Sequence, residues 1–274
     1  MALKHKKKTG RFLDDGEISP VAKVFIGLGF LFLLSVGGAI AGYFVSLKNE
    51  GEKFDKVTFC PKDGPESVTA LLIDRTDGIN EVQAKAIANL IRDWSAEIPV
   101  HGAFRIYEVS GAAGLAKPVV DVCNPGNPDA ASPLNSSVRQ VKARYEEKFT
   151  APIDMLVSHM KLDEKADSSP IMEAIRDISV QDFVSRVKAR RLIVITDLMQ
   201  HTGEFSLYKK PPDIKAFRES AYGRKVEAAL RDATVELYVV RSSAKQQTDA
   251  VGQFWLDWFY LQGADLQPPK KVPG

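Results

Sequence analysis

The chain has 274 residues, of which 45% are hydrophobic and 26% are charged. This length accommodates one membrane segment and one globular domain of about 200 residues, which excludes a second large domain. Six basic and three acidic residues precede Lys48, whereas the remaining chain carries 31 basic and 32 acidic residues. A folded part with this balance offers no electrostatic basis for nucleic-acid binding, and we predict no nucleic-acid partner.

The segment from Val24 to Leu47 contains no charged residue. A helix of about 24 residues exceeds the ~30 Å apolar core of a bilayer, so we predict a transmembrane helix over residues 23–47 that contacts membrane lipid. Basic residues gather in the leader, residues 1–22, and the positive-inside rule places that leader in the cytoplasm. We therefore expect a single-pass protein of the cytoplasmic (inner) membrane, with its C-terminal domain outside, in the periplasm of a bacterium. A cleaved signal peptide is the alternative, although its apolar region is usually about 7–15 residues long.

Small residues recur within the predicted membrane helix. Gly38, Gly42 and Ser46 stand four residues apart, so one face of the helix lets another helix backbone approach closely. This spacing predicts a helix partner in the membrane. Glycine is common in membrane helices anyway, so the pattern leaves open self-association, docking on a multispan protein, or no helix partner.

A polar connector, residues 48–66, follows the predicted membrane helix and contains the first of two cysteines. In an oxidising compartment, Cys60 and Cys123 would form a disulfide that closes a loop of about 63 residues and stabilises the fold by roughly 4 kcal/mol. Two unpaired thiols are the alternative, because the sequence does not give the distance between their Cα atoms.

The remaining chain alternates between apolar strand patterns and helical periods. We expect strands at residues 69–74, 104–109, 119–123, 192–196 and 235–240, and helices at residues 79–98, 135–161, 170–178, 212–231 and 251–262. Strands that are apolar at every position favour a parallel sheet covered on both faces. Only a short turn, Gly111 to Gly114, joins the second and third strands, so these two should pair antiparallel. Residues 265–274, which are rich in proline, are predicted to be a disordered tail.

Polar side chains follow two of the apolar strands. Asp74, Thr76 and Asp77 come directly after the first strand, and Asp197 comes directly after the fourth. Open α/β sheets bind ligands at the carboxyl ends of their strands, so these side chains mark a candidate site. The alternative is that Asp74 and Asp197 only cap helices and satisfy loop amides.

With these segments in view, residues 67–264 resemble a von Willebrand factor A (vWA) domain. The D-x-S-x-S motif of that family is matched by Asp74 to Gly78, with Thr76 at the first hydroxyl position and Gly78 departing from the second. Ser169 matches the threonine of the second loop. Asp197 matches the aspartate of the third loop, although Leu198 follows it where the family usually has glycine. The resemblance implies an α/β fold with a doubly wound, mostly parallel, Rossmann-like sheet and one antiparallel edge strand.

The resemblance also implies a metal-ion-dependent adhesion site at the carboxyl end of the sheet. Its metal would be Mg²⁺, with Mn²⁺ as a substitute, because hydroxyls, waters and a few carboxylates suit a hard cation. Asp74, Thr76 and Ser169 would bind it directly, and Asp197 through water. The accessory candidates are Asp77, Ser168 and His201. In such families an acidic residue of a protein partner often completes the coordination.

These features together predict a membrane-anchored, Mg²⁺-dependent protein-binding module in a membrane-associated complex, and not an enzyme. The first alternative is a metal-free structural scaffold subunit, and the second is a metal-dependent hydrolase that uses the same crevice. The sequence has no H-E-x-x-H, no G-x-x-x-x-G-K-[ST], no glycine-rich dinucleotide turn and no paired C-x-x-C. Ser169, Asp197 and His201 are residue types that occur in hydrolases, but nothing in their spacing demands such a set.

Overall fold

The computed structural model describes residues 20–109, 116–126, 138–159, 166–184, 186–209, 211 and 213–274. Most of the predicted leader and the Gly111 to Gly114 turn lie outside these residues. The chain divides into two units, residues 1–52 and residues 53–274, which are described separately below.

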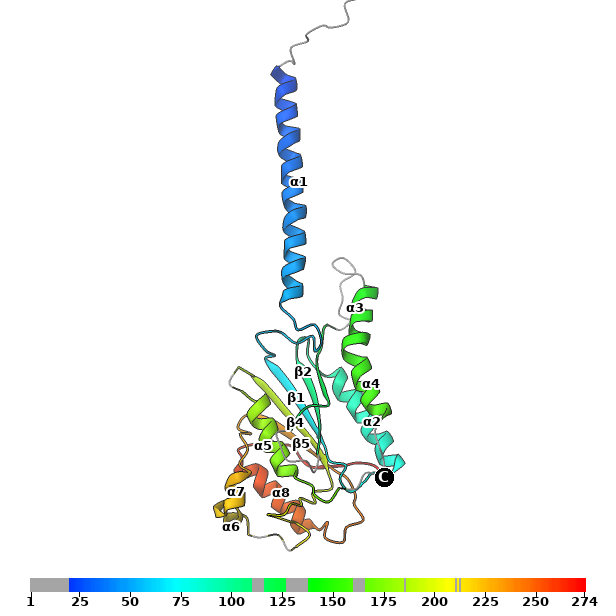
Figure 1. Ribbon diagram of the computed structural model, residues 1–274, viewed down its shortest axis with the longest axis vertical. Helices are drawn as coiled ribbons and strands as arrows, with labels where there is room; N and C mark the ends of the chain where they lie inside the picture. The colour runs from blue at the N-terminus through cyan, green and yellow to red at the C-terminus, as the bar shows by residue number, and fades with distance from the viewer. Residues whose placement is uncertain are drawn as a thin grey trace, which may run out of the picture. The chain divides into compact units, whose positions relative to one another are not determined.

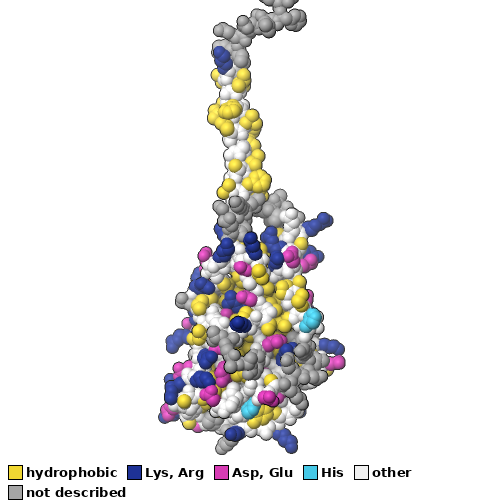
Figure 2. Space-filling view, viewed as in Figure 1, with side chains coloured by type: hydrophobic (Ala, Val, Ile, Leu, Met, Phe, Trp, Pro, Cys, Tyr) yellow, Lys and Arg dark blue, Asp and Glu magenta, His cyan; other side chains and the backbone are white. Residues whose placement is uncertain are grey.

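The first unit contains one long helix, α1 (Pro20–Glu52). Its segment Lys23–Val45 has a mean hydropathy of 2.3 and is long and apolar enough to cross a membrane, a test that a signal sequence also passes. Apolar side chains cover this segment in Figure 2, and its described side chains are exposed. The helix continues to Glu52, into the first residues of the predicted polar connector. No proline ends the helix at that point, and Lys48 and Glu50 are good helix formers.

The second unit is built on one sheet with the strand order β3-β2-β1-β4-β5-β6. Strand β7 also pairs with β5, at residues further along that strand than those that pair with β6. The strands are β1 (Ser67–Ile73), β2 (Ala103–Glu108), β3 (Val120–Cys123), β4 (Ala189–Thr196), β5 (Ala233–Val239), β6 (Asp265–Leu266) and β7 (Lys270–Lys271). Only β2 and β3 pair antiparallel, and every other pair is parallel. The predicted α/β fold class, with a mostly parallel sheet and an antiparallel edge strand, is confirmed.

Helices cover both faces of this sheet (Figure 1). They are α2 (Glu81–Ala96), α3 (Val138–Tyr145), a π-helical stretch (Glu146–Thr150), α4 (Ala151–Ser158), α5 (Ile171–Asp182), α6 (Ile214–Glu219), α7 (Ala221–Lys225) and α8 (Asp249–Leu261). Alternate residues of β1 enter two separate cores: Leu71 and Ile73 pack on the α2 and α4 side, and Ala70 and Leu72 on the α5 and α8 side. This arrangement explains why the strand is apolar at every position.

The aromatic residues of α8 belong to the core, as predicted. The buried members are Phe254, Trp255, Trp258 and Phe259. Their spacing follows the helical period, so α8 presents one apolar face to the sheet. The indole Nε1 of Trp255 donates a 2.9 Å hydrogen bond to the carbonyl oxygen of Leu198, which joins α8 to the loop after β4.

The tail prediction is wrong. Residues 265–274 run parallel to β5, through β6 and β7, and Val272 is buried in the core beside α2. Strand β5 would otherwise have an unpaired edge, and the tail supplies the missing hydrogen bonds. Pro268 and Pro269 fall between the two paired segments, where no ladder hydrogen bond is required of them.

The helix predicted over residues 212–231 is also wrong in part, because it is divided into α6 and α7. Ser220 separates them, and its hydroxyl accepts a 2.9 Å hydrogen bond from the amide of Gly223, which caps α7. A Cβ atom at Gly223 would lie only 2.0 Å from the carbonyl oxygen of Phe217. This close backbone approach requires glycine.

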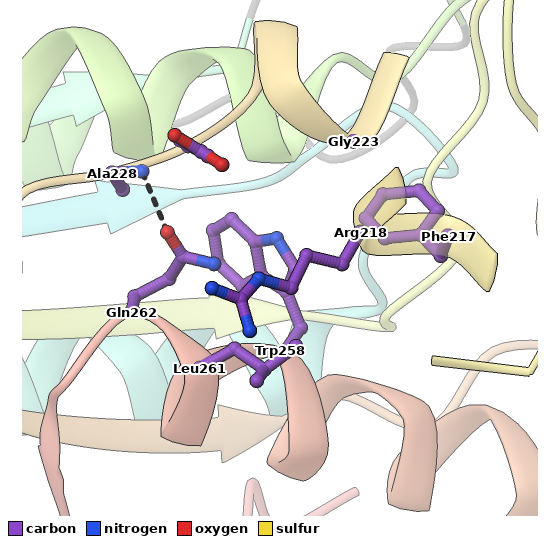
Figure 3. A pocket seen from close by; sticks show the side chains of 8 residues that line it. Phe217, Arg218, Gly223, Ala228, Trp258, Leu261 and Gln262 are labelled. Atoms are coloured by element: carbon purple, nitrogen blue, oxygen red, sulfur yellow. Dashed lines mark hydrogen bonds between the residues drawn. The ribbon is translucent and has the colours of Figure 1, made fainter. Parts of the chain in front are cut away.

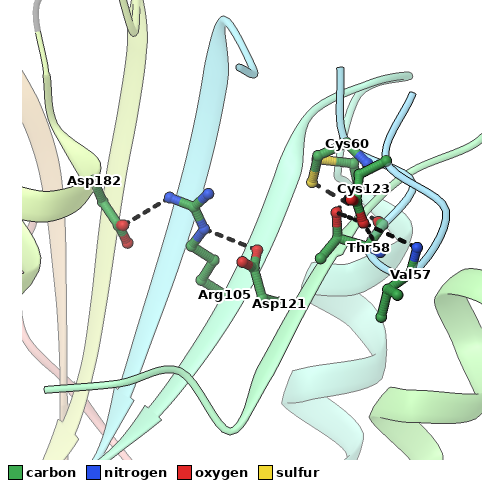
Figure 4. The surroundings of a disulfide bond; sticks show 8 residues. Val57, Thr58, Cys60, Arg105, Asp121, Cys123 and Asp182 are labelled. Atoms are coloured by element: carbon green, nitrogen blue, oxygen red, sulfur yellow. Dashed lines mark hydrogen bonds and ion pairs between the residues drawn. A yellow bond between two sulfur atoms is a disulfide. The ribbon is translucent and has the colours of Figure 1, made fainter. Parts of the chain in front are cut away.

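The segment after α1 is fastened to the edge of the sheet. Cys60 and Cys123 form a disulfide with their Cα atoms 4.8 Å apart (Figure 4). The Cys123 amide also donates a 2.8 Å hydrogen bond to the Thr58 carbonyl oxygen. On the neighbouring strand, the Arg105 guanidinium lies between the carboxylates of Asp121 and Asp182, at 2.9 and 2.7 Å. The carboxyl end of β3 is therefore bound to the segment after α1, and Asp121 of β3 is bound to β2.

Candidate functional site

The candidate site lies at the carboxyl ends of β1 and β4. These strands are adjacent and parallel, and Ile73 pairs with Ile195, so the residues that follow them emerge side by side. The Asp74 amide continues the pairing with a 2.8 Å hydrogen bond to the Ile195 carbonyl oxygen. The strand order runs in opposite directions from this point, towards β2 on one side and β5 on the other. Such a switch point is where open α/β sheets form their ligand crevice.

Asp74 is the centre of the site. Its Oδ1 accepts hydrogen bonds from the amide of Thr76, at 3.1 Å, and from the hydroxyl of Thr76, at 2.7 Å. Its Oδ2 accepts a 2.8 Å hydrogen bond from the Thr196 hydroxyl. The Ser169 hydroxyl lies 3.4 Å from Oδ1 and 3.5 Å from Oδ2. Burial raises the pKa of Asp74, while its hydrogen bonds with Thr76 and Thr196 oppose that rise.

A short backbone pairing brings Ser169 to Asp74. The Ser169 amide donates a 2.7 Å hydrogen bond to the His201 carbonyl oxygen, and the His201 amide donates a 3.0 Å hydrogen bond to the Ser169 carbonyl oxygen. The segment before α5 is thereby held against the segment after β4. Ser168, one residue earlier, is half-buried.

The ring of His201 is turned to its own loop. Its Nδ1 lies 2.9 Å from the Ser206 hydroxyl, and its ring packs edge-on against Tyr208 with 5.5 Å between centroids. No hydrogen bond joins the side chains of His201 and Ser169 in the described part of the chain. Among the described residues, the side chains of Ser169, Asp197 and His201 are not joined to one another by hydrogen bonds.

Asp197 is buried on the β4 side of the crevice. Its Oδ1 accepts a 2.9 Å hydrogen bond from the Met199 amide, whereas its Oδ2 has no hydrogen-bond partner among the described residues. Burial first, and then the nearby charges of Asp74 and Asp77, raise the pKa of Asp197 to about 8. Leu198, the next residue, has φ of 71°, so the chain keeps the left-handed backbone that glycine favours although the residue is leucine.

The turn after Asp74 accounts for Gly78. The Gly78 amide donates a 3.1 Å hydrogen bond to the Arg75 carbonyl oxygen, and Gly78 has φ of 74°. A hydroxyl residue would be strained in this backbone conformation, which fits the departure of Gly78 from the D-x-S-x-S pattern. Asp77 is exposed on the same turn, and its Oδ2 accepts a 2.8 Å hydrogen bond from the Tyr208 hydroxyl.

A small cavity of about 10 Å³ opens among these residues, which is about the space of one water molecule. It is lined by Asp74, Asp77, Gly78, Ile79, Asp197, Val240, Arg241 and Ser242. Its lining offers carboxylate oxygens and the hydroxyl of Ser242, the kinds of ligand that a hard divalent cation prefers, while the hydroxyls of Thr76 and Ser169 contact Asp74 without lining the cavity. Asp197 Oδ2 is a buried carboxylate oxygen without a hydrogen-bond partner among the described residues, and a bound cation would neutralise its charge. Within the described ranges, no group of three or more His, Cys, Asp or Glu side chains is arranged to hold a metal, so hydroxyls and waters would complete such a set.

Two of the residues at this site were not singled out from the sequence. Thr196 reads as the last residue of an apolar strand, and only the pairing register places its hydroxyl beside Asp74. Tyr208 lies in a loop without a recognisable motif. The sequence signal for Thr196 was a hydroxyl residue directly before a strand-end carboxylate.

No protein-family model matches the chain, and a search of curated proteins finds no match. Von Willebrand factor A domains are among the similar solved structures. The von Willebrand factor type A structure from Catenulispora acidiphila aligns with 73% of this chain and 42% of its own length, at 11% identity and a TM-score of 0.36.

Two other solved structures have comparable scores. Proximal thread matrix protein 1 from the mussel byssus, with a zinc-occupied MIDAS motif, aligns with 72% of this chain and 46% of its own length, at 12% identity and a TM-score of 0.39. An aerotolerance-related membrane protein from Bacteroides fragilis aligns with 76% of this chain and 92% of its own length, at 13% identity and a TM-score of 0.37. Since these TM-scores are below 0.5, the fold class rests on the topology of this chain's own sheet.

Proposed function

We propose that the chain is a single-pass membrane protein whose domain binds a protein partner at the crevice between β1 and β4. One observation carries this proposal: Asp74, Thr76 and Ser169 come together beside Asp197, whose buried Oδ2 has no hydrogen-bond partner among the described residues. Hydroxyl oxygens gathered around one buried carboxylate, with an unsatisfied oxygen on a second carboxylate nearby, are suited to a ligand rather than to packing alone.

A divalent cation fits this donor set. Mg²⁺, or Mn²⁺ in its place, would be held by Asp74 and by the hydroxyls of Thr76 and Ser169, with Asp197 nearby. Such a cation supplies positive charge to two carboxylates that otherwise repel each other. It also gives the crevice affinity for an acidic residue of the partner. Asp77 and Arg241 at the rim would contribute to partner selection through their charges.

The membrane position is supported by α1 and by the cysteines. The apolar segment Lys23–Val45 follows the basic leader, which by the positive-inside rule supports a domain outside the cytoplasmic membrane. A disulfide between Cys60 and Cys123 fits an oxidising compartment, such as the periplasm of a bacterium.

Calorimetric titration of Mg²⁺ and Mn²⁺ into the full-length chain in detergent tests the proposal. We expect saturable binding by the wild type and its loss in Asp74→Ala. The matched control is Asp93→Ala, which removes an exposed carboxylate from α2. No binding by the wild type, or equal binding by Asp74→Ala, would exclude the cation site.

A metal-free scaffold is the second candidate, and one observation favours it. Both carboxylate oxygens of Asp74 already accept hydrogen bonds from protein groups, those of Thr76 and Thr196. A carboxylate satisfied in this way is stable without a cation. In that case the crevice would be a structural junction, and assembly in the membrane would depend on α1.

A further inference from the structure

A second and larger cavity lies away from the crevice, between α6, α7 and the C-terminal end of α8. Its volume is about 220 Å³, which is smaller than the roughly 300–1,000 Å³ of drug-sized sites. The residues that line it are Phe217, Arg218, Gly223, Glu227, Ala228, Trp258, Leu261 and Gln262. None of them lines the Asp74 cavity, so this is a separate candidate site for a small ligand.

The cavity carries one group of each charge. Arg218 and Glu227 both line it, and both are exposed. Neither forms an ion pair or a side-chain hydrogen bond within the part of the chain that the structure describes, either with each other or with another residue. Two opposite charges that share a cavity without pairing match a ligand that itself carries both charges.

Hydrogen-bond donors accompany Arg218. The amide of Gln262 is oriented by its Oε1, which accepts a 2.8 Å hydrogen bond from the Ala228 backbone, so its Nε2 remains a donor (Figure 3). The Trp258 Nε1 is buried and has no hydrogen-bond partner among the described residues. Figure 3 shows the side chains of Gln262, Trp258 and Arg218 around the same space. A carboxylate is the acceptor that suits this group of donors.

The rest of the lining is apolar. Phe217 contributes a buried ring, Trp258 an indole face and Leu261 an aliphatic side chain. These surfaces would remove an apolar ligand group from water.

We propose that this cavity binds a free α-amino acid with an apolar side chain. The carboxylate would face Arg218, Gln262 and Trp258. The ammonium group would face Glu227, and the side chain would pack against Phe217 and Leu261. A peptide terminus is the less suitable ligand, because it presents only one of the two charges.

Calorimetry with the full-length chain in detergent tests this proposal, with L-leucine as the probe. Its comparators are N-acetyl-L-leucine, which lacks the ammonium charge, and L-leucinamide, which lacks the carboxylate. We expect saturable binding of leucine and at least about tenfold weaker binding of each comparator.

Variants assign each charge of the ligand to its residue. Arg218→Gln and Glu227→Gln should each weaken leucine binding by about tenfold. Arg218→Gln should leave the affinity for leucinamide unchanged, because leucinamide has no carboxylate. Glu227→Gln should leave the affinity for N-acetyl-leucine unchanged, because that compound has no ammonium group. The control Lys215→Gln alters an exposed cation of α6 that does not line the cavity, and it should have no effect.

Three outcomes would overturn the proposal: no saturable binding of leucine, equal affinity for leucine and N-acetyl-leucine, or leucine binding that neither variant weakens. Asp74→Ala should bind leucine as the wild type does. Leucine binding therefore tests this cavity independently of the cation site at Asp74.

Discussion

Thr196 Oγ1 donates a 2.8 Å hydrogen bond to Asp74 Oδ2, from the last residue of β4 to the first residue after β1. The same hydroxyl accepts a 2.9 Å hydrogen bond from the Leu198 amide. Thr196 therefore connects Asp74 to the loop that carries Asp197, and it fixes the orientation of the central carboxylate.

Thr196→Val keeps the shape of the side chain and removes both hydrogen bonds. Because Asp74 then loses a buried donor, we expect the free energy of unfolding to fall by about 1–3 kcal/mol and Mg²⁺ binding to weaken. Urea unfolding and calorimetry measure the two effects. Thr69→Val is the matched control, since Thr69 is buried in β1 and makes no side-chain hydrogen bond in the described residues. Equal stability of the Thr196→Val and Thr69→Val variants would contradict this role.

The raised pKa of Asp197 predicts a pH dependence of stability. In the unfolded chain its pKa returns to about 4, so between about pH 4 and pH 8 the folded state binds more protons than the unfolded state. In the presence of a chelator, the contribution of Asp197 to the free energy of unfolding should be greatest below about pH 4. It should fall as the pH rises towards 8 and level off above that.

Asp197→Asn removes this titration. At pH 8 in chelator, we expect the variant to be more stable than the wild type by on the order of 2 kcal/mol, with the difference vanishing near pH 4. Thermal unfolding across this pH range measures the difference. If stability depends on pH with the same slope in the wild type and in Asp197→Asn, the pKa of the Asp197 carboxyl is not raised in the folded state.

The disulfide gives a third prediction. Replacing Cys60 and Cys123 together by serine should lower the free energy of unfolding by about 2–4 kcal/mol, because the unfolded chain regains the entropy of an open loop. Reduction of the wild type should produce the same loss, and the reductant should leave the double variant unchanged. Chemical unfolding with and without reductant measures both, and insensitivity of the wild type would argue against a bond that stabilises the fold.

Much of the fold and the first positions of the site were predictable, because buried parallel strands are apolar throughout and end in polar residues. That pattern identified β1 and β4 and drew attention to Asp74 and Asp197. The role of Thr196 was not predictable in this way. It depends on the register between the two strands, which no single segment encodes.

The remaining errors have one cause, which is that contacts distant in sequence outweigh local pattern. Val272 lies in a proline-rich stretch, yet the open edge of β5 orders it. Gly223 lies in a helical pattern, yet the carbonyl of Phe217 approaches it and the chain turns there. The cavity beside Trp258 follows from that turn, so it had no signal in the sequence either.

The two candidate functions differ in what they require of α1, and Gly42→Ile separates them. A Cβ atom at Gly42 meets nothing within 4 Å, so the substitution leaves the isolated helix intact. If the chain is a scaffold subunit held through the Gly38 and Gly42 face, the variant should lose its place in the membrane complex, while Asp74→Ala should keep it.

Native gel electrophoresis of solubilised membranes measures the size of that complex. The matched control is Gly29→Ile, since Gly29 is nine residues from Gly38, which at about 100° per residue places it on the opposite side of the helix. If the crevice rather than the helix holds the complex together, the result reverses: Asp74→Ala disrupts the assembly, and both glycine variants leave it intact.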